Sequence, residues 1–182
     1  MKECIVVNLV GAPGAGKSTG AAYIFSQLKM RGVNAELITE FAKDKVWEEN
    51  QEVFKADNQV YLFGKQFYRM SRCRDKVDVI VTDSPLLLSI LYNHSEVLGK
   101  GFNKVVLNVF NSFNNMTYLL IRDKPYNPKG RHQSEAESDA LVEPLTNLLK
   151  NNNIGYTTAY GNSMDYDVIV DEIMEKLDGY DG

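Results

Sequence analysis

The sequence has few of the residues that build disulfide frameworks, zinc sites and membrane spans. Two cysteines among 182 residues are too few for a disulfide framework, and Cys4 lies in an apolar run typical of a buried reduced thiol. The two histidines, His94 and His132, are far apart in sequence and neither is beside a cysteine pair, so we expect no zinc site. No stretch approaches the roughly 18 apolar residues of a membrane span. We therefore expect a soluble cytoplasmic protein that makes no membrane contact.

Neither sign of charge dominates the chain. It has 20 basic and 24 acidic residues, for a net charge of -4, which argues against uniform electrostatic binding to nucleic acid. A local basic stripe remains compatible with contacts to phosphates. The length and the 44% hydrophobic content suit one compact domain with a core, and we expect a single domain over residues 1–182.

Short β-branched apolar runs alternate with amphipathic segments along the chain. We expect strands at 4–10, 34–38, 77–82, 117–121 and 156–160. Expected helices cover 20–30, 58–72, 135–150 and 166–177, and residues 39–51 are expected to form a loop or irregular helix. The alternation is typical of βαβ units with right-handed crossovers. It predicts an α/β fold with a mainly parallel five-stranded sheet and helices on both faces.

Residues 11–18 read GAPGAGKS, a full match to the phosphate-binding P-loop pattern G-x-x-x-x-G-K-[ST], between a predicted strand and a predicted helix. Its glycines let backbone N–H groups surround a phosphate, and the following helix points its positive end at the same anion. Lys17 then reaches the β- and γ-phosphates, the Ser18 hydroxyl suits Mg²⁺, and Thr19 suits the α-phosphate. A glycine-rich turn without a ligand is the weaker alternative. The nucleotide-binding residues expected here are Gly11, Ala12, Pro13, Gly14, Ala15, Gly16, Lys17, Ser18 and Thr19.

Two carboxylates follow predicted strands, and the carboxyl ends of parallel strands are where ligands bind. Asp83 ends the run VIVTD and is a candidate to hold Mg²⁺ or its water, the alternative being a turn-capping role before Pro85. Glu40 follows the second strand and is a candidate general base that accepts a proton from an attacking hydroxyl. A plain surface role for Glu40 remains open.

Residues 123–134, DKPYNPKGRHQS, combine two prolines, a glycine and several charges, which predicts an exposed loop. Such a loop can close over a nucleotide as a lid and exclude water. Arg131 is the candidate to stabilise charge on the transferred phosphoryl group, and Arg122 is a candidate to stack on the adenine. The alternative is a solvated loop without catalytic duty.

Resemblance to a known family comes from four segments, GAPGAGKST, TEFAKDKVW, VIVTDSP and IRDKPYNPKGRHQSEAES. Together they resemble the P-loop nucleoside and nucleotide kinases over most of the chain. Similar proteins include the nicotinamide-riboside-kinase domain of the bifunctional NAD regulator and small bacteriophage P-loop kinases. Some of the phage kinases phosphorylate hydroxymethyluracil within DNA.

The resemblance implies a role for several residues. It makes Glu40 the base and Arg131 the lid arginine, and it places Gly161 and Asn162 beside the adenine, where a simple strand-to-helix turn is the alternative. Trp47 follows Glu40 much as a tryptophan follows the carboxylate of deoxynucleoside kinases. The sequence departs from those kinases by lacking a proline after the carboxylate and by reading DSP at 83–85 in place of a Glu-Arg-Ser motif. The identity of the acceptor therefore stays open.

The acceptor is expected between Glu40 and a helix face that combines aromatic and basic side chains. Tyr61, Lys65, Tyr68 and Arg72 share this face, where rings could stack on a base and cations could hold phosphates. A packed or merely solvated face is the alternative reading.

The sequence predicts an ATP-dependent, Mg²⁺-requiring kinase that transfers the γ-phosphate to a hydroxyl of a nucleoside or nucleotide. One alternative acceptor is a hydroxymethyl pyrimidine in phage DNA, which would place the protein in the host cytoplasm. A P-loop ATPase without an acceptor is an alternative of another class. The only Asn-Lys pair, at 103–104, leads into Val-Val, so the guanine-reading N-K-x-D motif is absent and a GTPase switch is disfavoured. A homodimer is compatible with the sequence.

Overall fold

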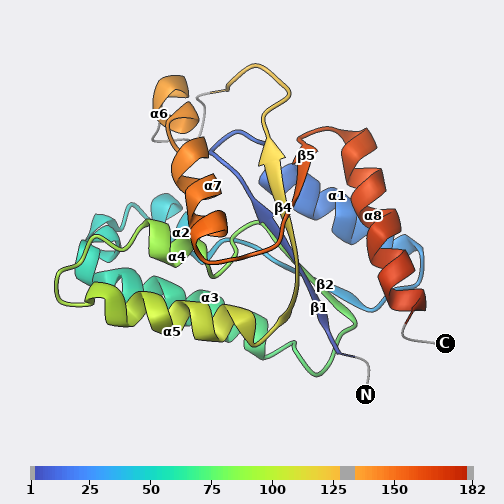
Figure 1. Ribbon diagram of the computed structural model, residues 1–182, viewed down its shortest axis with the longest axis horizontal. Coiled ribbons are helices and arrows are strands. Elements are labelled where there is room, and N and C mark those ends of the chain that lie inside the picture. The colour runs from blue at the N-terminus through green and yellow to red at the C-terminus, as the bar shows by residue number, and fades with distance from the viewer. Residues whose placement is uncertain (1–2, 128–133, 180–182) are drawn as a thin grey trace.

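The computed structural model describes residues 3–127 and 134–179, and its centre is a sheet of five parallel strands (Figure 1). The strands are β1 (Ile5–Val10), β2 (Ala35–Ile38), β3 (Val79–Thr82), β4 (Asn114–Ile121) and β5 (Thr157–Tyr160), in the order β2-β3-β1-β4-β5. Every neighbouring pair is parallel, so all carboxyl ends lie at one edge. The expected α/β fold with a mainly parallel five-stranded sheet is confirmed.

The central strand β1 is buried along its whole length because both faces of the sheet are covered. Ile5, Val7 and Leu9 pack against α1 (Lys17–Met30) and α8 (Ser163–Asp178). Val6 packs on the other face against α3 (Gln59–Ser71) and α5 (Gly99–Asn111). Figure 1 shows α1 and α8 on one side of the sheet and α3, α5 and α7 on the other. This two-sided burial explains why β1 reads as a continuous apolar run rather than an alternating one.

The remaining helices are short and lie mostly near the carboxyl edge of the sheet. They are α2 (Phe41–Trp47), α4 (Leu88–Leu91), α6 (Glu135–Asp139) and α7 (Val142–Asn151), with 3₁₀ turns at Gln51–Phe54 and Ala56–Asn58. Residues 39–51, expected as a loop or irregular helix, thus contain one regular helix. Among the described helices, none is long and apolar enough to cross a bilayer.

The expected helix over 135–150 is two helices in the structure. It breaks after Asp139, and α7 begins at Val142. Pro144 explains the break, because proline has no N–H to donate within a helix but is tolerated in a first turn, where N–H groups lack intrahelical partners. The short helix α6 has its own start signal, a capping box in which the Ser134 hydroxyl accepts from Glu137 N–H. Because the helix breaks here, α6 need not follow the axis of α7 and can lie toward the P-loop.

Candidate active site

The P-loop lies between the end of β1 and the start of α1, where its sequence pattern predicts it. Gly14 and Gly16 have φ angles of 84° and 99°, a region that side chains other than glycine rarely adopt. The Lys17 ammonium folds over the loop and donates to the carbonyls of Gly11 (2.7 Å) and Ala12 (3.1 Å). Ser18 and Thr19 lie exposed in the first turn of α1. The nine predicted residues therefore form one continuous segment that ends in the first turn of α1, and the N–H groups at a helix N-terminus suit an anion.

Glu40 and Asp83, from different strands, meet beside this loop. The Asp83 carboxylate accepts a hydrogen bond from the Glu40 N–H at 3.1 Å and is only 5% exposed. Glu40 and Asp83 meet because β2, β3 and β1 are neighbouring strands. Thr82, at the end of β3, lies opposite Ile38 of β2 and Asn8 of β1. The structure thus brings the two predicted carboxylates together.

The ionisation of Glu40 links it to the other charges of the site. Burial raises the pKa of the Glu40 carboxyl, and the negative charge of Asp83 raises it further. The charges of Lys17 and Lys43 oppose this rise, and burial outweighs them. A carboxyl group with a raised pKa beside a P-loop lysine is a better proton acceptor than a solvated one.

Two side chains of α3 hold the backbone at Glu40, a role that the sequence did not suggest for either of them. Gln66 accepts from the Phe41 N–H (3.0 Å) and donates to the Thr39 carbonyl (3.3 Å). Arg69 donates to the same carbonyl (3.2 Å) and pairs with Asp44 (2.6 Å). The available signal was a glutamine at a buried position of an amphipathic helix. The oxygen and the nitrogen of a buried side-chain amide both need hydrogen-bond partners.

Tyr92, just after α4, is a further neighbour of Glu40 that the sequence did not suggest. The residue as a whole is 44% exposed, yet burial of its hydroxyl end raises its pKa. The charge of Glu40 is the second cause of that rise. The Tyr92 hydroxyl is therefore close enough to Glu40 for the carboxylate charge to act on it.

The turn between β5 and α8 packs directly on the P-loop. A Cβ at Gly161 would lie 2.2 Å from the Ala15 carbonyl oxygen, so only glycine fits there. Asn162 caps α8 by accepting from Asp165 N–H (3.0 Å), and its amide donates to Asp123 (2.9 Å). The predicted neighbours of the adenine thus lie next to the phosphate loop and the start of the predicted lid.

Arg122, at the end of β4, is held by α6. One of its nitrogens, Nη2, pairs with Asp139 (2.6 Å) and Glu135 (3.0 Å), and its guanidinium lies 5.2 Å from the centre of the Tyr126 ring. Its other terminal nitrogen, Nη1, is buried without a hydrogen-bond partner among the residues that the structure describes. Arg131, the predicted lid arginine, lies outside the described residues.

The predicted acceptor face on α3 is exposed and hollowed. Tyr61, Gly64, Lys65 and Tyr68 line a shallow depression of about 420 Å³, with the Lys65 ammonium 5.5 Å from the centre of the Tyr61 ring. Tyr61 also contacts Phe41, the residue after Glu40, edge to face at 5.7 Å between ring centres. The depression is therefore connected to the Glu40 end of the site through one aromatic pair.

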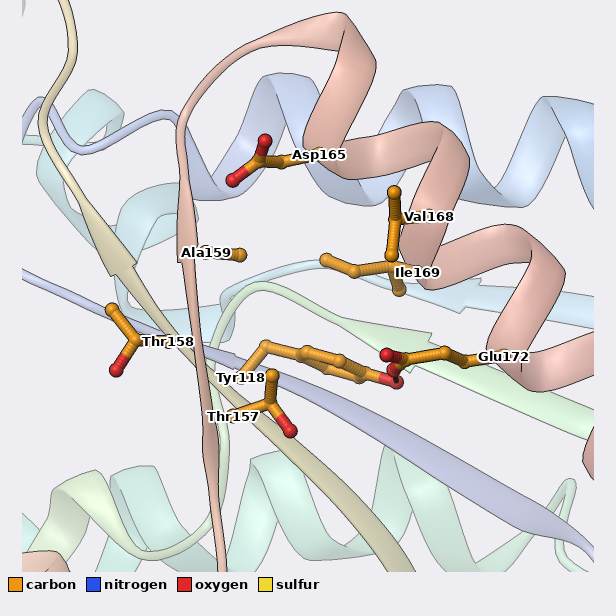
Figure 2. A pocket seen from close by; sticks show the side chains of 8 residues that line it. All are labelled: Tyr118, Thr157, Thr158, Ala159, Asp165, Val168, Ile169 and Glu172. Carbon is orange, nitrogen blue, oxygen red and sulfur yellow. Dashed lines mark hydrogen bonds between the residues drawn. The ribbon is translucent and has the colours of Figure 1, made fainter.

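A second depression lies between the sheet and α8 (Figure 2). Its two acidic side chains already have partners, because Glu172 accepts from the Tyr118 hydroxyl (2.7 Å) and Asp165 accepts from the Tyr160 N–H (2.5 Å). Burial and the Glu172 carboxylate raise the pKa of Tyr118, so the phenol remains a donor. These bonds join α8 to the sheet, and we assign the depression a structural role.

The oxygen ligands that Mg²⁺ prefers are present at the P-loop. Ser18 offers a hydroxyl in the first turn of α1, and Asp83 offers a buried carboxylate at the neighbouring strand end. No group of three or more His, Cys, Asp or Glu side chains suited to a metal occurs within the described ranges. One hydroxyl and one carboxylate fit a magnesium ion whose other ligands are phosphate oxygens and water.

Comparison with known proteins agrees with this geometry. A family model described as an AAA domain matches residues 6–165. A solved structure of similar fold is described as "Crystal structure of NadR protein in complex with NR", with a TM-score of 0.67 and 15% sequence identity. The likeness covers 94% of this chain and 50% of that one, so the chain spans half the length of the NadR chain. No curated protein matches the sequence. The matched residues make up more than half of the chain and include the P-loop, Glu40 and Asp83. This chain therefore belongs to the AAA domain family and has a P-loop NTPase fold similar to that of the NadR structure.

Proposed function

We propose that this protein is an ATP-dependent kinase that transfers the γ-phosphate to a hydroxyl of a nucleoside- or nucleotide-type acceptor. The observation that carries the proposal is the meeting of Glu40, Asp83 and Lys17 at one end of the sheet. A protein that only binds ATP has no need of a half-buried carboxylate with a raised pKa beside the P-loop lysine. A kinase needs such a group to accept the proton of the attacking hydroxyl.

The phosphates are bound by the backbone of the P-loop and by Lys17. The N–H groups of residues 14–19 and the positive end of α1 attract the negative charge. Lys17 exchanges its bonds to the Gly11 and Ala12 carbonyls for bonds to the β- and γ-phosphates, which lie in the same concavity. Charge that develops on the transferred group is thus neutralised by a cation already in place.

Ser18 and Asp83 would hold Mg²⁺, which supplies positive charge that neutralises the phosphate oxygens. Asp83 also fixes the Glu40 backbone through its hydrogen bond, so one carboxylate serves both functions. Gln66 and Arg69 hold the residues on either side of Glu40 and keep its side chain in place.

The remaining predicted residues contribute to nucleotide binding and to the lid. Arg122 is proposed to contact the base with its unpartnered nitrogen, and Gly161 and Asn162 are proposed to border the base from the turn after β5. Arg131 is proposed to contact the γ-phosphate as the lid closes, which would also exclude water. Ser134, the last residue of the predicted lid, caps α6, whose carboxylates already hold Arg122.

Support for a nucleoside-type acceptor comes from the similar NadR structure, which was solved in complex with NR. It agrees with the sequence resemblance to nicotinamide-riboside kinases. The AAA domain family also makes an ATPase without an acceptor the main rival. ATP turnover that is independent of any added acceptor would favour that rival.

A DNA-borne hydroxyl is the second candidate acceptor, and the exposed face of α3 favours it. From Gln59 to Ser71 this helix carries Lys65 and Arg69 and no acidic residue, and Arg72 follows directly. Arg69 is already paired with Asp44, so Lys65 and Arg72, together with Tyr61 and Tyr68, would form the surface on which bases stack and phosphates bind. A hydroxymethyl base would have to leave the stack to reach Glu40, so single strands are the easier substrate.

The experiment that tests the proposal is transfer of label from γ-labelled ATP to a panel of nucleosides, nucleotides and hydroxymethylated DNA. Lys17→Ala should lower the transfer rate by about 10²-fold or more, as loss of a group that stabilises transition-state charge does. Lys29→Ala, at the exposed end of the same helix, is the matched control and should retain wild-type transfer. Near-wild-type transfer by Lys17→Ala, or no labelled acceptor with any panel member, would contradict the proposal.

A further inference from the structure

Two hydroxyl groups from distant parts of the chain hold the outer side of the P-loop. The Ser138 hydroxyl, in α6, donates to the Pro13 carbonyl at 2.6 Å. The Tyr166 hydroxyl, in α8, donates to the Gly16 carbonyl at 3.0 Å. Ser138 is 1% exposed and Tyr166 is 3% exposed, so neither bond competes with water. Neither residue belongs to the P-loop motif.

Each of these carbonyls belongs to a peptide unit whose N–H points the opposite way. A trans peptide is planar, so the Pro13 carbonyl sets the direction of the Gly14 N–H, and the Gly16 carbonyl sets that of the Lys17 N–H. Gly14 and Gly16 have positive φ angles and carry no side chain that would restrain these peptides sterically. The Gly16 carbonyl also accepts from the Gly20 N–H (2.7 Å), and the Tyr166 hydroxyl adds a second donor to the same oxygen. A bond to the outer carbonyl therefore directs the inner N–H into the concavity.

Close packing reinforces the same arrangement from α8. A Cβ at Gly20 would lie 2.6 Å from the Tyr166 ring, so the ring rests directly on the backbone of α1. A Cβ at Gly161 would lie 2.2 Å from the Ala15 carbonyl oxygen, whose peptide carries the Gly16 N–H. Three carbonyls of the loop are therefore contacted by other parts of the chain. Pro13 is contacted by α6, Ala15 by the turn after β5, and Gly16 by α8.

We propose that Ser138 and Tyr166 are positioning residues for phosphate binding. Their hydroxyls orient the Gly14 and Lys17 N–H groups toward the phosphates before the nucleotide arrives. Preorganised donors bind an anion more tightly because the reorientation of the loop is already complete. The inference rests on the proposed function only insofar as the P-loop binds a nucleotide.

The test compares nucleotide binding by Tyr166→Phe and Ser138→Ala with that by matched controls. Tyr23→Phe removes a hydroxyl that donates to Asp167 between the same two helices, and Ser26→Ala removes one that donates to the Tyr23 carbonyl. Titration calorimetry should show the dissociation constant of Mg·ATP rising about 5-fold in each test variant, the size expected for one hydrogen bond. The double variant should show about a 25-fold rise, and both controls should bind as the wild type does.

Inorganic tripolyphosphate, which has no base, separates an effect on the phosphate loop from an effect elsewhere. Its affinity should fall by the same factor as that of Mg·ATP. Variants that lose thermal stability yet bind both ligands with wild-type affinity would overturn the inference, since a merely structural role predicts that result. Weakened ATP binding with unchanged tripolyphosphate binding would also overturn it.

The outcomes also separate this inference from the proposed function. If the wild type binds Mg·ATP and both variants bind it equally well, the positioning role fails and the kinase proposal stands. If the wild type binds no nucleotide, both fail. Should one variant not fold, the other decides, because each hydroxyl acts on a different peptide.

Discussion

Glu40 is the residue whose chemical role can be separated most cleanly from nucleotide binding. Glu40→Gln keeps the shape of the side chain but removes the proton acceptor, so transfer should fall by roughly 10²-fold or more. ATP affinity should be unchanged, because the carboxylate is proposed to act on the acceptor. Rapid-quench transfer assays and ATP titrations measure the two effects. Glu49→Gln, exposed after α2, is the control, and loss of ATP binding in Glu40→Gln would indicate a metal-binding role instead.

The raised pKa of Glu40 predicts the acid limb of the pH profile. A general base works when deprotonated, so kcat/KM should increase with pH through the pKa of Glu40, at a pH above the ordinary glutamate value of 4.5. The Lys43 charge lowers this pKa, so Lys43→Gln should move the limb to still higher pH. A pH series of kcat/KM for both proteins tests this. A limb that moved to lower pH in Lys43→Gln would contradict the assignment.

At the residue scale, the sequence identified the groups with intrinsic chemistry but not those that orient them. Lys17 and Asp83 are recognisable because a motif and a strand end point to them. Gln66, Ser138 and Tyr166 have no such signal, because a glutamine, serine or tyrosine acquires its role from the carbonyl or N–H that it meets. Those partners lie at least 25 residues away along the chain.

At the scale of elements, α3 contains a glycine that its packing does not require. Gly64 lies inside the helix, and a Cβ there would meet nothing within 4 Å. Gly64→Ala should therefore raise the free energy of unfolding by roughly 0.5–1 kcal/mol through lower chain entropy and better helix propensity. Chemical denaturation measures the change.

Gly161→Ala is the matched contrast, since a Cβ there would lie 2.2 Å from a backbone oxygen, and this substitution should destabilise the protein. Stabilisation by both substitutions would contradict the packing at the P-loop. Unchanged or lower stability in Gly64→Ala would show that α3 needs flexibility at this point.

Local sequence patterns predicted whether each element is a helix or a strand. The residues at which the elements end depended on tertiary contacts and on proline. β1 and α1 were expected because an apolar run, a glycine loop and an amphipathic segment follow one another. The break between α6 and α7 was missed because the amphipathic pattern continues across it. Pro144 and the capping box at Ser134 set the break, and the bond from Ser138 to Pro13 gives α6 its direction.

At the scale of the whole molecule, charge distinguishes a free acceptor from a polymeric one. The net charge of -4 opposes binding of DNA, whereas the α3 face is locally basic. If DNA is the acceptor, contacts from Lys65 and Arg72 to two phosphates should give log K a slope of about -1.4 against log salt on single strands. Phosphorylation of a free nucleoside should show almost no salt dependence.

The double variant Lys65→Gln/Arg72→Gln tests this assignment on both kinds of acceptor. It should flatten the salt dependence on DNA, whereas the weak salt dependence of nucleoside phosphorylation should stay as it is in the wild type. Lys29→Gln/Lys150→Gln removes the same charge from the exposed ends of α1 and α7 and serves as the control. Activity on DNA that is insensitive to salt and to the double variant would eliminate the DNA acceptor.

The sequence by itself determined the fold class and the P-loop, because both depend on residues that are neighbours in the chain. Eight consecutive residues specify the phosphate loop, and the alternation of apolar runs specifies parallel strands and covering helices. Only the tertiary structure decided which distant groups meet there. Asp83 reaches the Glu40 backbone across 43 residues, Ser138 reaches Pro13 across 125, and Tyr166 reaches Gly16 across 150. Such meetings depend on the strand order β2-β3-β1-β4-β5 and on where each helix packs, which the local patterns do not encode.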